Sequence, residues 1–192
     1  MIYLARHGQT QFNRDQRLQG RIDSPLTELG LAQARQVGAW FAPRVAAGGD
    51  WMLAVSPLGR AQHTARLVAQ AAGLTAEAVV TDERLIELSI GSWEGLSRDQ
   101  IEALRPDLAG EPFFMHSPDG EAWDPAAVRL GGFLEEHAGS DRKVIAISHA
   151  GAGKVMRGVH LGLPLGEVRH LDAPQDAVFA LTPGAIERLD CL

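Results

Sequence analysis

The sequence predicts an α/β fold in which helices cover both faces of a central, mostly parallel sheet. Three short apolar runs, MIYLA (1–5), WMLAVS (51–56) and KVIAIS (143–148), are typical of strands buried on both faces. Helical patterns separate these runs, and the alternation of strands with helices indicates parallel connections. DAVFAL (176–181) and AIERLD (185–190) follow the same logic, so we expect two more strands there.

Capping and stop signals predict the helices between the strands. Thr27 caps a helix that reaches about Arg44, and Gly73 stops a second helix over 58–72. Ser97 and Gln100 form a capping box for a short helix that ends before Pro106. Asp124 and Pro125 begin a helix that Gly139 stops, and a last helix runs from near Gly151 to about Leu161. The chain has no internal repeats, and we expect one domain over residues 1–192.

Composition and charge exclude several classes of protein. Of the 192 residues, 45% are hydrophobic and 22% are charged, which is ordinary for a globular protein. The net charge of -6 argues against a nucleic-acid partner. No apolar run has the length of a membrane span, no signal peptide is visible, and the single Cys191 cannot form a disulfide within the chain. We expect a cytoplasmic protein without a membrane partner, either a monomer or a homodimer.

Two predicted strands end in the same way. MIYLA leads into Arg6, His7 and Gly8, and KVIAIS leads into His149 and Ala150. The carboxyl ends of parallel strands lie on one edge of a sheet, where ligands bind. We therefore expect the two histidines to lie side by side.

A third strand end supplies an arginine. WMLAVS leads into Ser56-Pro57, and Arg60 follows in the first turn of the next helix, where the helix dipole disfavours a cation. An anion at this position would compensate for that cost. We expect Arg6 and Arg60 to bind one phosphate with His7 as the nucleophile, and Gly8 to let the backbone approach that phosphate closely.

Two other motifs fit less well. GAGKV (151–155) resembles part of a phosphate-binding P-loop, but it has Val155 where Ser or Thr should hold a metal ion, and it lacks the upstream glycine. AISHA (146–150) has the layout of a hydrolase nucleophile elbow around Ser148, with alanines in place of both glycines. There is no HExxH motif and no Cys/His cluster, so we expect neither a metal nor another cofactor.

Five blocks together resemble the histidine phosphatase superfamily, in its phosphoglycerate-mutase-like branch. They are LARHGQTQFN (4–13), LQGRIDSPLTELGLAQA (18–34), SPLGRAQHTA (56–65), LIELSIGSWEG (85–95) and ISHAG (147–151). One block would be a weak signal, whereas five in order over about residues 1–160 are a strong one. The resemblance implies a three-layer α/β/α sandwich and a metal-independent phosphohistidine mechanism.

The resemblance also implies a role for each residue at the strand ends. His7 attacks phosphorus in line. Arg6, Arg60 and His149 hold the equatorial oxygens, where charge sits in a loose transition state. The other phosphate-binding residues implied are Gly8, Thr10, Asn13 and Ala150.

The acid/base residue comes from the fourth block. Residue types alone leave Glu87 and Glu94 open, and the family position falls on Glu87, which is expected to protonate the leaving alcohol and then deprotonate water. Two departures from the family pattern affect the site. Ala150 replaces a frequent glycine, and SPDGEAW (117–123) has Ala122 for a serine, so a side-chain donor to the substrate is missing.

The lid-like stretch at about 105–123 bears on the substrate. Residues 106–128 contain no Lys or Arg, whereas classical mutases of the family carry basic residues and a longer insertion here. The stretch offers Phe113, Phe114, Met115 and Trp123, which form either a minor core or an apolar lid. A second phosphate then lacks a counter-charge, which favours a phosphatase acting on a small phosphorylated metabolite over a phosphoglycerate mutase. A catalytically silent phosphate-binding module is the third alternative.

Overall fold

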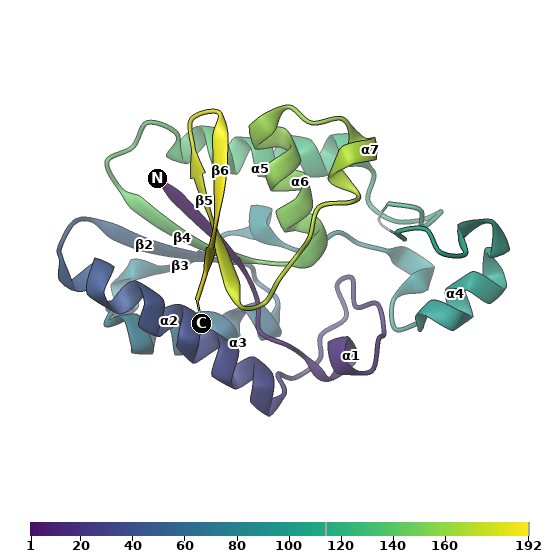
Figure 1. The fold of residues 1–192 in the computed structure, drawn as a ribbon, viewed down its shortest axis with the longest axis horizontal. Coiled ribbons are helices and arrows are strands. Elements are labelled where there is room, and N and C mark those ends of the chain that lie inside the picture. The colour runs from purple at the N-terminus through teal and green to yellow at the C-terminus, as the bar shows by residue number, and fades with distance from the viewer. Residues whose placement is uncertain (114, 192) are drawn as a thin grey trace.

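A computed structural model describes residues 1–113 and 115–191 (Figure 1). The strands are β1 (Ile2–Arg6), β2 (Trp51–Val55), β3 (Val79–Thr81), β4 (Lys143–Ser148), β5 (Ala177–Thr182) and β6 (Ala185–Asp190). The helices are α1 (Gln11–Arg14), α2 (Glu28–Ala46), α3 (Gly59–Ala72), α4 (Arg98–Leu104), α5 (Trp123–His137), α6 (Ala150–Leu161) and α7 (Leu165–Val168). Within the described residues, no helix combines the length and apolar character that a membrane span requires.

The strands form one sheet in the order β3-β2-β4-β1-β5-β6. The first four strands in this order run parallel, which confirms the predicted mostly parallel sheet. Arg6 pairs with Ser148 and Val55 pairs with Ile147, so β1, β2 and β4 end at one edge. β5 runs antiparallel to β1, and β6 returns antiparallel to β5 after a two-residue connection that is too short for a parallel crossover. β3 was not predicted, because its three residues, VVT, are too few to show a strand pattern.

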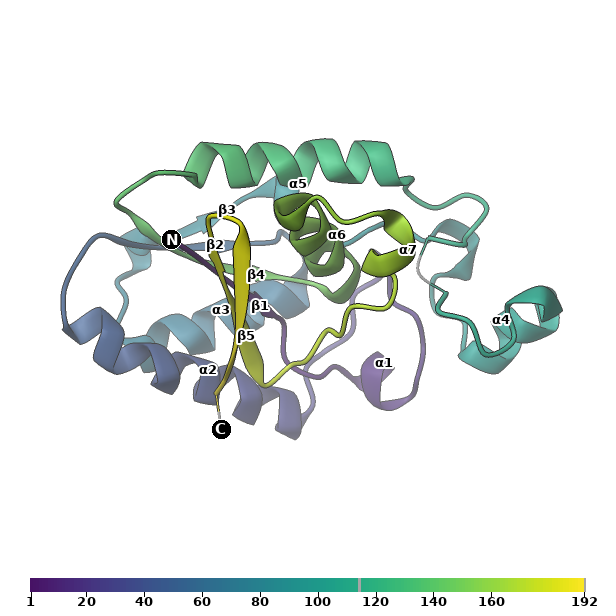
Figure 2. The same cartoon turned by 45° about the horizontal axis from the view of Figure 1, so that its top comes forward.

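Helices cover both faces of the sheet and complete the three-layer α/β/α sandwich (Figures 1 and 2). On one face α2 and α3 pack over β4, with Phe41 and Ile145 in one buried cluster. On the other face α5 and α6 pack in a second cluster, which contains Phe133, Met156 and Val144. Val144 and Ile145 are neighbours on β4 that point to opposite faces, as the two-residue period of a strand requires.

The capping signals of α2, α3 and α4 lie where the sequence predicts them. The Thr27 hydroxyl accepts a hydrogen bond from the Gly30 amide at 3.1 Å, and α2 begins at the next residue after Thr27. Ser97 and Gln100 form the reciprocal capping box of α4. Gly73 ends α3 in the left-handed conformation with φ 75°, which favours glycine.

The start of α5 differs from the prediction. The sequence places the N-cap at Asp124, whereas the helix begins at Trp123 and its N-cap is Ala122. Ala122 has the extended backbone of an N-cap but no side-chain cap hydrogen bond. A serine here would cap the helix. Ala122 therefore leaves the start of this helix without a side-chain cap, and the expectation of a lost donor to the substrate stays a prediction.

The stretch after α4 contains a third, small cluster of buried side chains. It consists of Trp93, Ile101, Leu108 and Phe113. Figure 2 shows that α4 projects beyond the edge where β1, β2 and β4 end. The minor-core interpretation is thus confirmed for Phe113, whose ring lies edge-on to Trp93 at 6.0 Å. Trp123 packs against the main core instead, and Phe114 lies outside the described residues.

We expect Ala122→Ser to stabilise the protein, because the hydroxyl would supply the missing cap of α5. Ser in place of Ala at an N-cap is worth about 0.5–2 kcal/mol of unfolding free energy. The midpoint of urea unfolding should rise at an unchanged m-value. Ala138→Ser is the matched control, because Ala138 is the C-cap of the same helix and lacks the exposed amides that a hydroxyl could cap. Equal midpoints for the two variants would contradict the assignment.

Candidate active site

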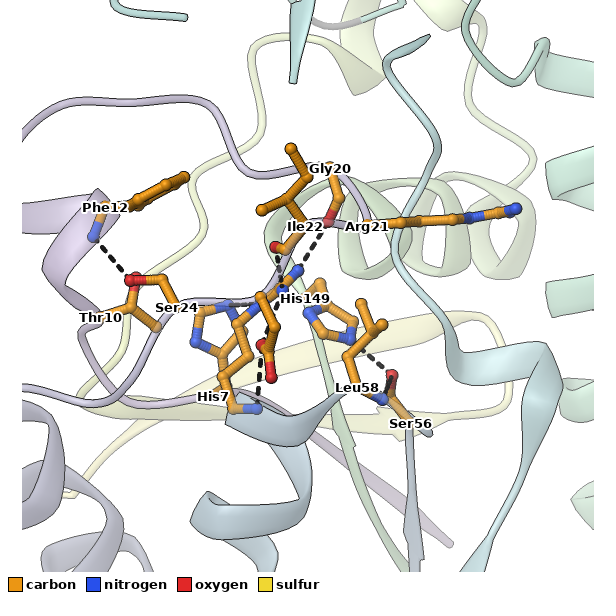
Figure 3. Close-up of polar contacts among 12 residues, drawn as sticks. His7, Thr10, Phe12, Gly20, Arg21, Ile22, Ser24, Ser56, Leu58 and His149 are labelled. Atoms are coloured by element: carbon orange, nitrogen blue, oxygen red, sulfur yellow. Dashed lines mark hydrogen bonds and ion pairs between the residues drawn. The ribbon is translucent and has the colours of Figure 1, made fainter. Parts of the chain in front are cut away.

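The ends of β1 and β4 bring the two predicted histidines together (Figure 3). The ring centroids of His7 and His149 are 5.2 Å apart, with their planes tilted by 58°. Both side chains are buried, with 2% and 1% of their surface exposed. The backbone amide of His7 donates to the carbonyl of Ser148 at 3.0 Å, which continues the β1–β4 pairing into the site.

His7 is held in one tautomer. Its Nδ1 lies 2.8 Å from the carbonyl oxygen of Gly8, which only accepts, so Nδ1 carries the proton. Its Nε2 accepts a hydrogen bond from Nε of Arg60 at 3.2 Å. Burial, followed by the charges of Arg6 and Arg60, lowers the pKa of His7 well below its usual value. Nε2 is therefore the unprotonated atom that is able to act as a nucleophile.

Arg60 is a buried cation in the first turn of α3, with 2% of its surface exposed. Its guanidinium donates to the carbonyl oxygens of Gly20 at 2.7 Å and Ile22 at 2.9 Å. It also pairs with a carboxylate oxygen of Asp23 at 3.1 Å. Burial lowers the pKa of Arg60. These contacts fix the guanidinium beside His7, in the position of an anion-binding group.

Two buried nitrogens beside this pair have no hydrogen-bond partner among the described residues. They are Nε of Arg6 and Nδ1 of His149. Nε2 of His149 lies 2.6 Å from the Ser56 hydroxyl, and Figure 3 shows the other ring nitrogen on the side that faces His7. Burial is the main reason that the pKa of Arg6 falls to about 10 and that of His149 falls well below its usual value. The unsatisfied Nε–H of Arg6 and an unpartnered ring nitrogen of His149, both near Arg60, fit a phosphate group.

Glu87 is fixed at the N-terminus of α6. Its Oε1 accepts from the Ala152 amide at 2.8 Å, and its Oε2 accepts from the Gly151 amide at 3.1 Å. The positive end of the helix dipole favours a carboxylate there. Glu87 lines the pocket together with His7, whereas Glu94 does not; the Glu94 carboxylate accepts from the backbone amide of Arg21 at 2.9 Å. The geometry therefore separates the two carboxylates that residue types left open.

Gly8 and Thr10 lie behind the pocket wall. A Cβ on Gly8 would be 2.3 Å from the carbonyl oxygen of Gly30, and the Gly8 amide donates to the hydroxyl of Thr64 at 3.1 Å. Gly8 therefore allows close approach to α2 rather than to a phosphate, which corrects the reason given for it. The Thr10 hydroxyl accepts from the backbone amide of Asn13 at 3.2 Å and caps α1. Asn13 thus lines the pocket, whereas Thr10 does not line it and holds Asn13 in place.

The pocket has a volume of about 280 Å³ and an apolar and a polar wall. Ala150 lines the pocket as predicted, and so do three further polar residues, Arg17, Gln19 and Lys154. The apolar wall consists of Leu18, Leu88, Ile90, Phe113 and Met115. Two cations thus reach the pocket from outside residues 106–128, and the expectation that a second anion lacks a counter-charge is wrong. Lys154 follows Ala150 by one helical turn, a spacing that would have identified it.

Comparison with known proteins identifies the family. The model of the histidine phosphatase superfamily (branch 1) matches residues 2–185. The chain belongs to this family. A probable phosphoglycerate mutase, GpmB, of Yersinia pestis (strain Pestoides F) is 38% identical over 178 residues, which cover 88% of this chain and 79% of that protein.

Solved structures similar to this chain include a phosphatase. A mycobacterial glucosyl-3-phosphoglycerate phosphatase in complex with VO3 has a TM-score of 0.77 at 29% identity, with 93% of this chain and 92% of that chain covered. YhfR of Bacillus stearothermophilus has a TM-score of 0.74 at 27% identity, with 97% and 93% covered. The protein is thus an enzyme of the histidine phosphatase family, with phosphatase or mutase activity.

We expect the buried histidines to reduce stability in mild acid. The pKa values of His7 and His149 in the folded protein lie well below the usual value of 6.5, so the unfolded chain binds more protons below that pH. Stability is therefore full above about pH 6.5 and falls as the pH decreases, by about 1 kcal/mol per histidine between pH 6.5 and 5.5. Urea unfolding at both pH values measures this change. His149→Gln should remove about half of the two-histidine contribution, and an unchanged pH dependence would refute the assignment.

Proposed function

We propose that this histidine phosphatase hydrolyses small phosphomonoesters through a phosphohistidine on His7. The observation that carries the proposal is the fixed tautomer of His7, because its Nε2 lone pair meets Arg60 and carries no proton. An anion attracted by Arg60 is therefore brought to the nucleophilic nitrogen. The unpartnered nitrogens of Arg6 and His149 supply further donors for the phosphoryl oxygens.

In the first step Nε2 of His7 attacks phosphorus, and the bond from phosphorus to the leaving oxygen breaks. Arg6 and Arg60 stabilise the charge on the equatorial oxygens. Glu87, protonated when the ester binds, gives its proton to the leaving alkoxide and is left as the carboxylate. In the second step the Glu87 carboxylate takes a proton from water, whose oxygen attacks phosphorus. The P–N bond breaks, its electron pair returns to Nε2, and phosphate leaves.

Two observations favour hydrolysis over intramolecular transfer. The stretch 106–128 contains no Lys or Arg, and its described part adds Phe113 and Met115 to the pocket wall. This apolar surface suits a leaving group with an aliphatic or aromatic part. The similar mycobacterial structure is itself a phosphatase. We further propose that the stretch 105–123 covers the mouth of the site, and that the chain forms a single domain.

A phosphoglycerate mutase is the second candidate, because Arg17 and Lys154 line the same pocket. The Lys154 ammonium donates to the carbonyl oxygen of Arg169 at 2.9 Å, which holds it near the wall. A mutase needs cations for the second anionic group of its bisphosphate intermediate. We expect phosphate release from 3-phosphoglycerate to exceed its conversion to 2-phosphoglycerate, with and without added bisphosphate. Dominant, bisphosphate-stimulated conversion would assign the mutase activity instead.

Covalent labelling tests the nucleophile. Brief reaction with a ³²P-labelled phosphomonoester in EDTA, followed by an alkaline quench, should leave a base-stable, acid-labile label on His7. His7→Gln should abolish both the label and turnover, because no other side chain in the proposed mechanism attacks phosphorus. An acid-stable label on Ser148 would support the nucleophile-elbow alternative, and loss of activity in EDTA would contradict metal independence.

Replacement of Glu87 tests the acid/base role. Glu87→Gln should lower kcat for an alkyl phosphate by roughly 10²–10⁴, the usual contribution of a positioned acid/base group. The loss should be smaller for p-nitrophenyl phosphate, because its leaving group hardly needs a proton. Glu94→Gln is the matched control from the same block, and it should show no such dependence on the leaving group. Equal losses of Glu87→Gln on both esters would indicate a structural role.

A further inference from the structure

The segment that carries Glu87 has little regular structure of its own. After a single 3-10 turn at Glu83–Leu85 the backbone continues over 86–90 without a helix or a strand. Its carbonyl groups therefore need hydrogen-bond donors from other parts of the chain. These donors therefore determine the position of the Glu87 backbone, from which its side chain extends.

Arg129 of α5 binds the segment just before Glu87. Its Nη1 donates to the carbonyl oxygen of Ile86 at 2.8 Å and to that of Arg84 at 2.5 Å. Its Nε and Nη2 form a bidentate pair with the Glu121 carboxylate at 2.8 and 3.0 Å. The two side chains of this pair are only 17% and 11% exposed. Such a pair fixes the direction of the guanidinium as well as its charge.

Arg21 binds the carbonyl group of Glu87 itself. Its Nε donates to that oxygen at 3.2 Å, and its Nη2 donates to Glu121 Oε2 at 3.1 Å. The backbone amide of Glu121 donates to the carbonyl oxygen of Ser89 at 2.8 Å. The Glu121 carboxylate thus holds both Arg21 and Arg129, while the backbone amide of Glu121 binds the segment that follows Glu87.

Arg21 also belongs to the loop that holds Arg60. Its two neighbours, Gly20 and Ile22, accept the guanidinium hydrogen bonds of Arg60. Figure 3 shows the side chain of Arg21 extending away from His7. The loop therefore contacts the phosphate-binding arginine through its backbone and Glu121 through the side chain of Arg21.

We infer that Glu121 is a positioning residue that sets the placement of the Glu87 carboxyl relative to the phosphate held by Arg60. Glu121 does not line the pocket and has no contact with the reacting atoms in this arrangement. It acts through Arg129 and Arg21 on the backbone of the segment that carries Glu87, and through Arg21 on the loop that binds Arg60. Small misplacements of a catalytic group are costly, because proton transfer requires hydrogen-bond distance. The inference rests on the proposed role of Glu87.

Glu121→Gln keeps the size of the side chain and removes the charge that holds the two arginines. We expect kcat for propyl phosphate to fall by roughly 10–100-fold, because Glu87 loses its alignment with the leaving oxygen. Turnover of p-nitrophenyl phosphate should change less than about 3-fold, because that leaving group hardly needs protonation. A merely structural role would lower both rates equally through the fraction of folded enzyme.

A double-mutant comparison separates positioning from other effects. If Glu121 acts through Glu87, the Glu87→Gln/Glu121→Gln enzyme should be no slower on propyl phosphate than Glu87→Gln alone. Multiplied losses would overturn the inference. Glu102→Gln is the matched control, because it breaks the Arg98–Glu102 pair of α4, neither residue of which lines the pocket, and it should leave both rates unchanged. Equal losses on both esters in Glu121→Gln would also overturn it.

A second variant covers the case in which Glu121→Gln does not fold. Arg21→Gln removes the hydrogen bond to the Glu87 carbonyl from a side chain that is 43% exposed, so folding should persist. The same selective loss on propyl phosphate is expected, and an unselective one counts against the inference. If wild-type enzyme hydrolyses neither ester, the proposed function itself fails. If Glu87→Gln shows no leaving-group dependence, the role of Glu87 fails, independently of Glu121.

Discussion

Arg60 has 2% of its surface exposed, and an uncompensated buried cation costs several kcal/mol. Its position in the first turn of α3 adds an unfavourable helix-dipole contribution. The surrounding chain is arranged to offset both costs. The loop over 18–24 turns back across the strand ends, so that Gly20 and Ile22 present carbonyl oxygens and Asp23 presents a carboxylate. The need to stabilise the Arg60 guanidinium therefore accounts for the position of this loop. It also accounts for the position of His7 beside the guanidinium and of the pocket next to them.

The second charge of the site is held by a different device. Glu87 accepts from two amides at the start of α6, so its partners are backbone groups and do not include the cations of the phosphate site. Arg60 already pairs with the Asp23 carboxylate, and a further pair between Glu87 and Arg6 or Arg60 would neutralise the cations that are proposed to bind an anion. The amides of α6 keep the carboxylate in the same pocket as those arginines without a direct ion pair to either. The histidines add no charge, since burial lowers the pKa of both, and Nε2 of His7 faces Arg60 as an acceptor.

The sequence predicted the parts of this arrangement that depend on local signals. Buried strands, the caps of α2 and α4 and the shared sheet edge follow from composition, capping residues and connection rules. The purpose of Gly8 could not be predicted, because its close contact is with Gly30, whose position depends on how α2 packs. Lys154 was missed because it reaches the pocket from α6, outside residues 106–128. The ion pairs of Glu121 with Arg129 and Arg21 could not be predicted either, because these partners lie 8 and 100 residues away in the chain.

The hydrogen bond between Arg60 and His7 indicates how the site is preorganised. Nε of Arg60 donates to the same Nε2 atom that is proposed to attack phosphorus. When the P–N bond forms, that lone pair is consumed and the donor needs a new acceptor. A phosphoryl oxygen on Nε2 lies within reach of the same N–H, so the guanidinium has only to exchange one acceptor for another. Its other N–H groups remain on Gly20, Ile22 and Asp23, and little reorganisation is required as charge develops, which is the condition under which fixed charges accelerate a reaction most.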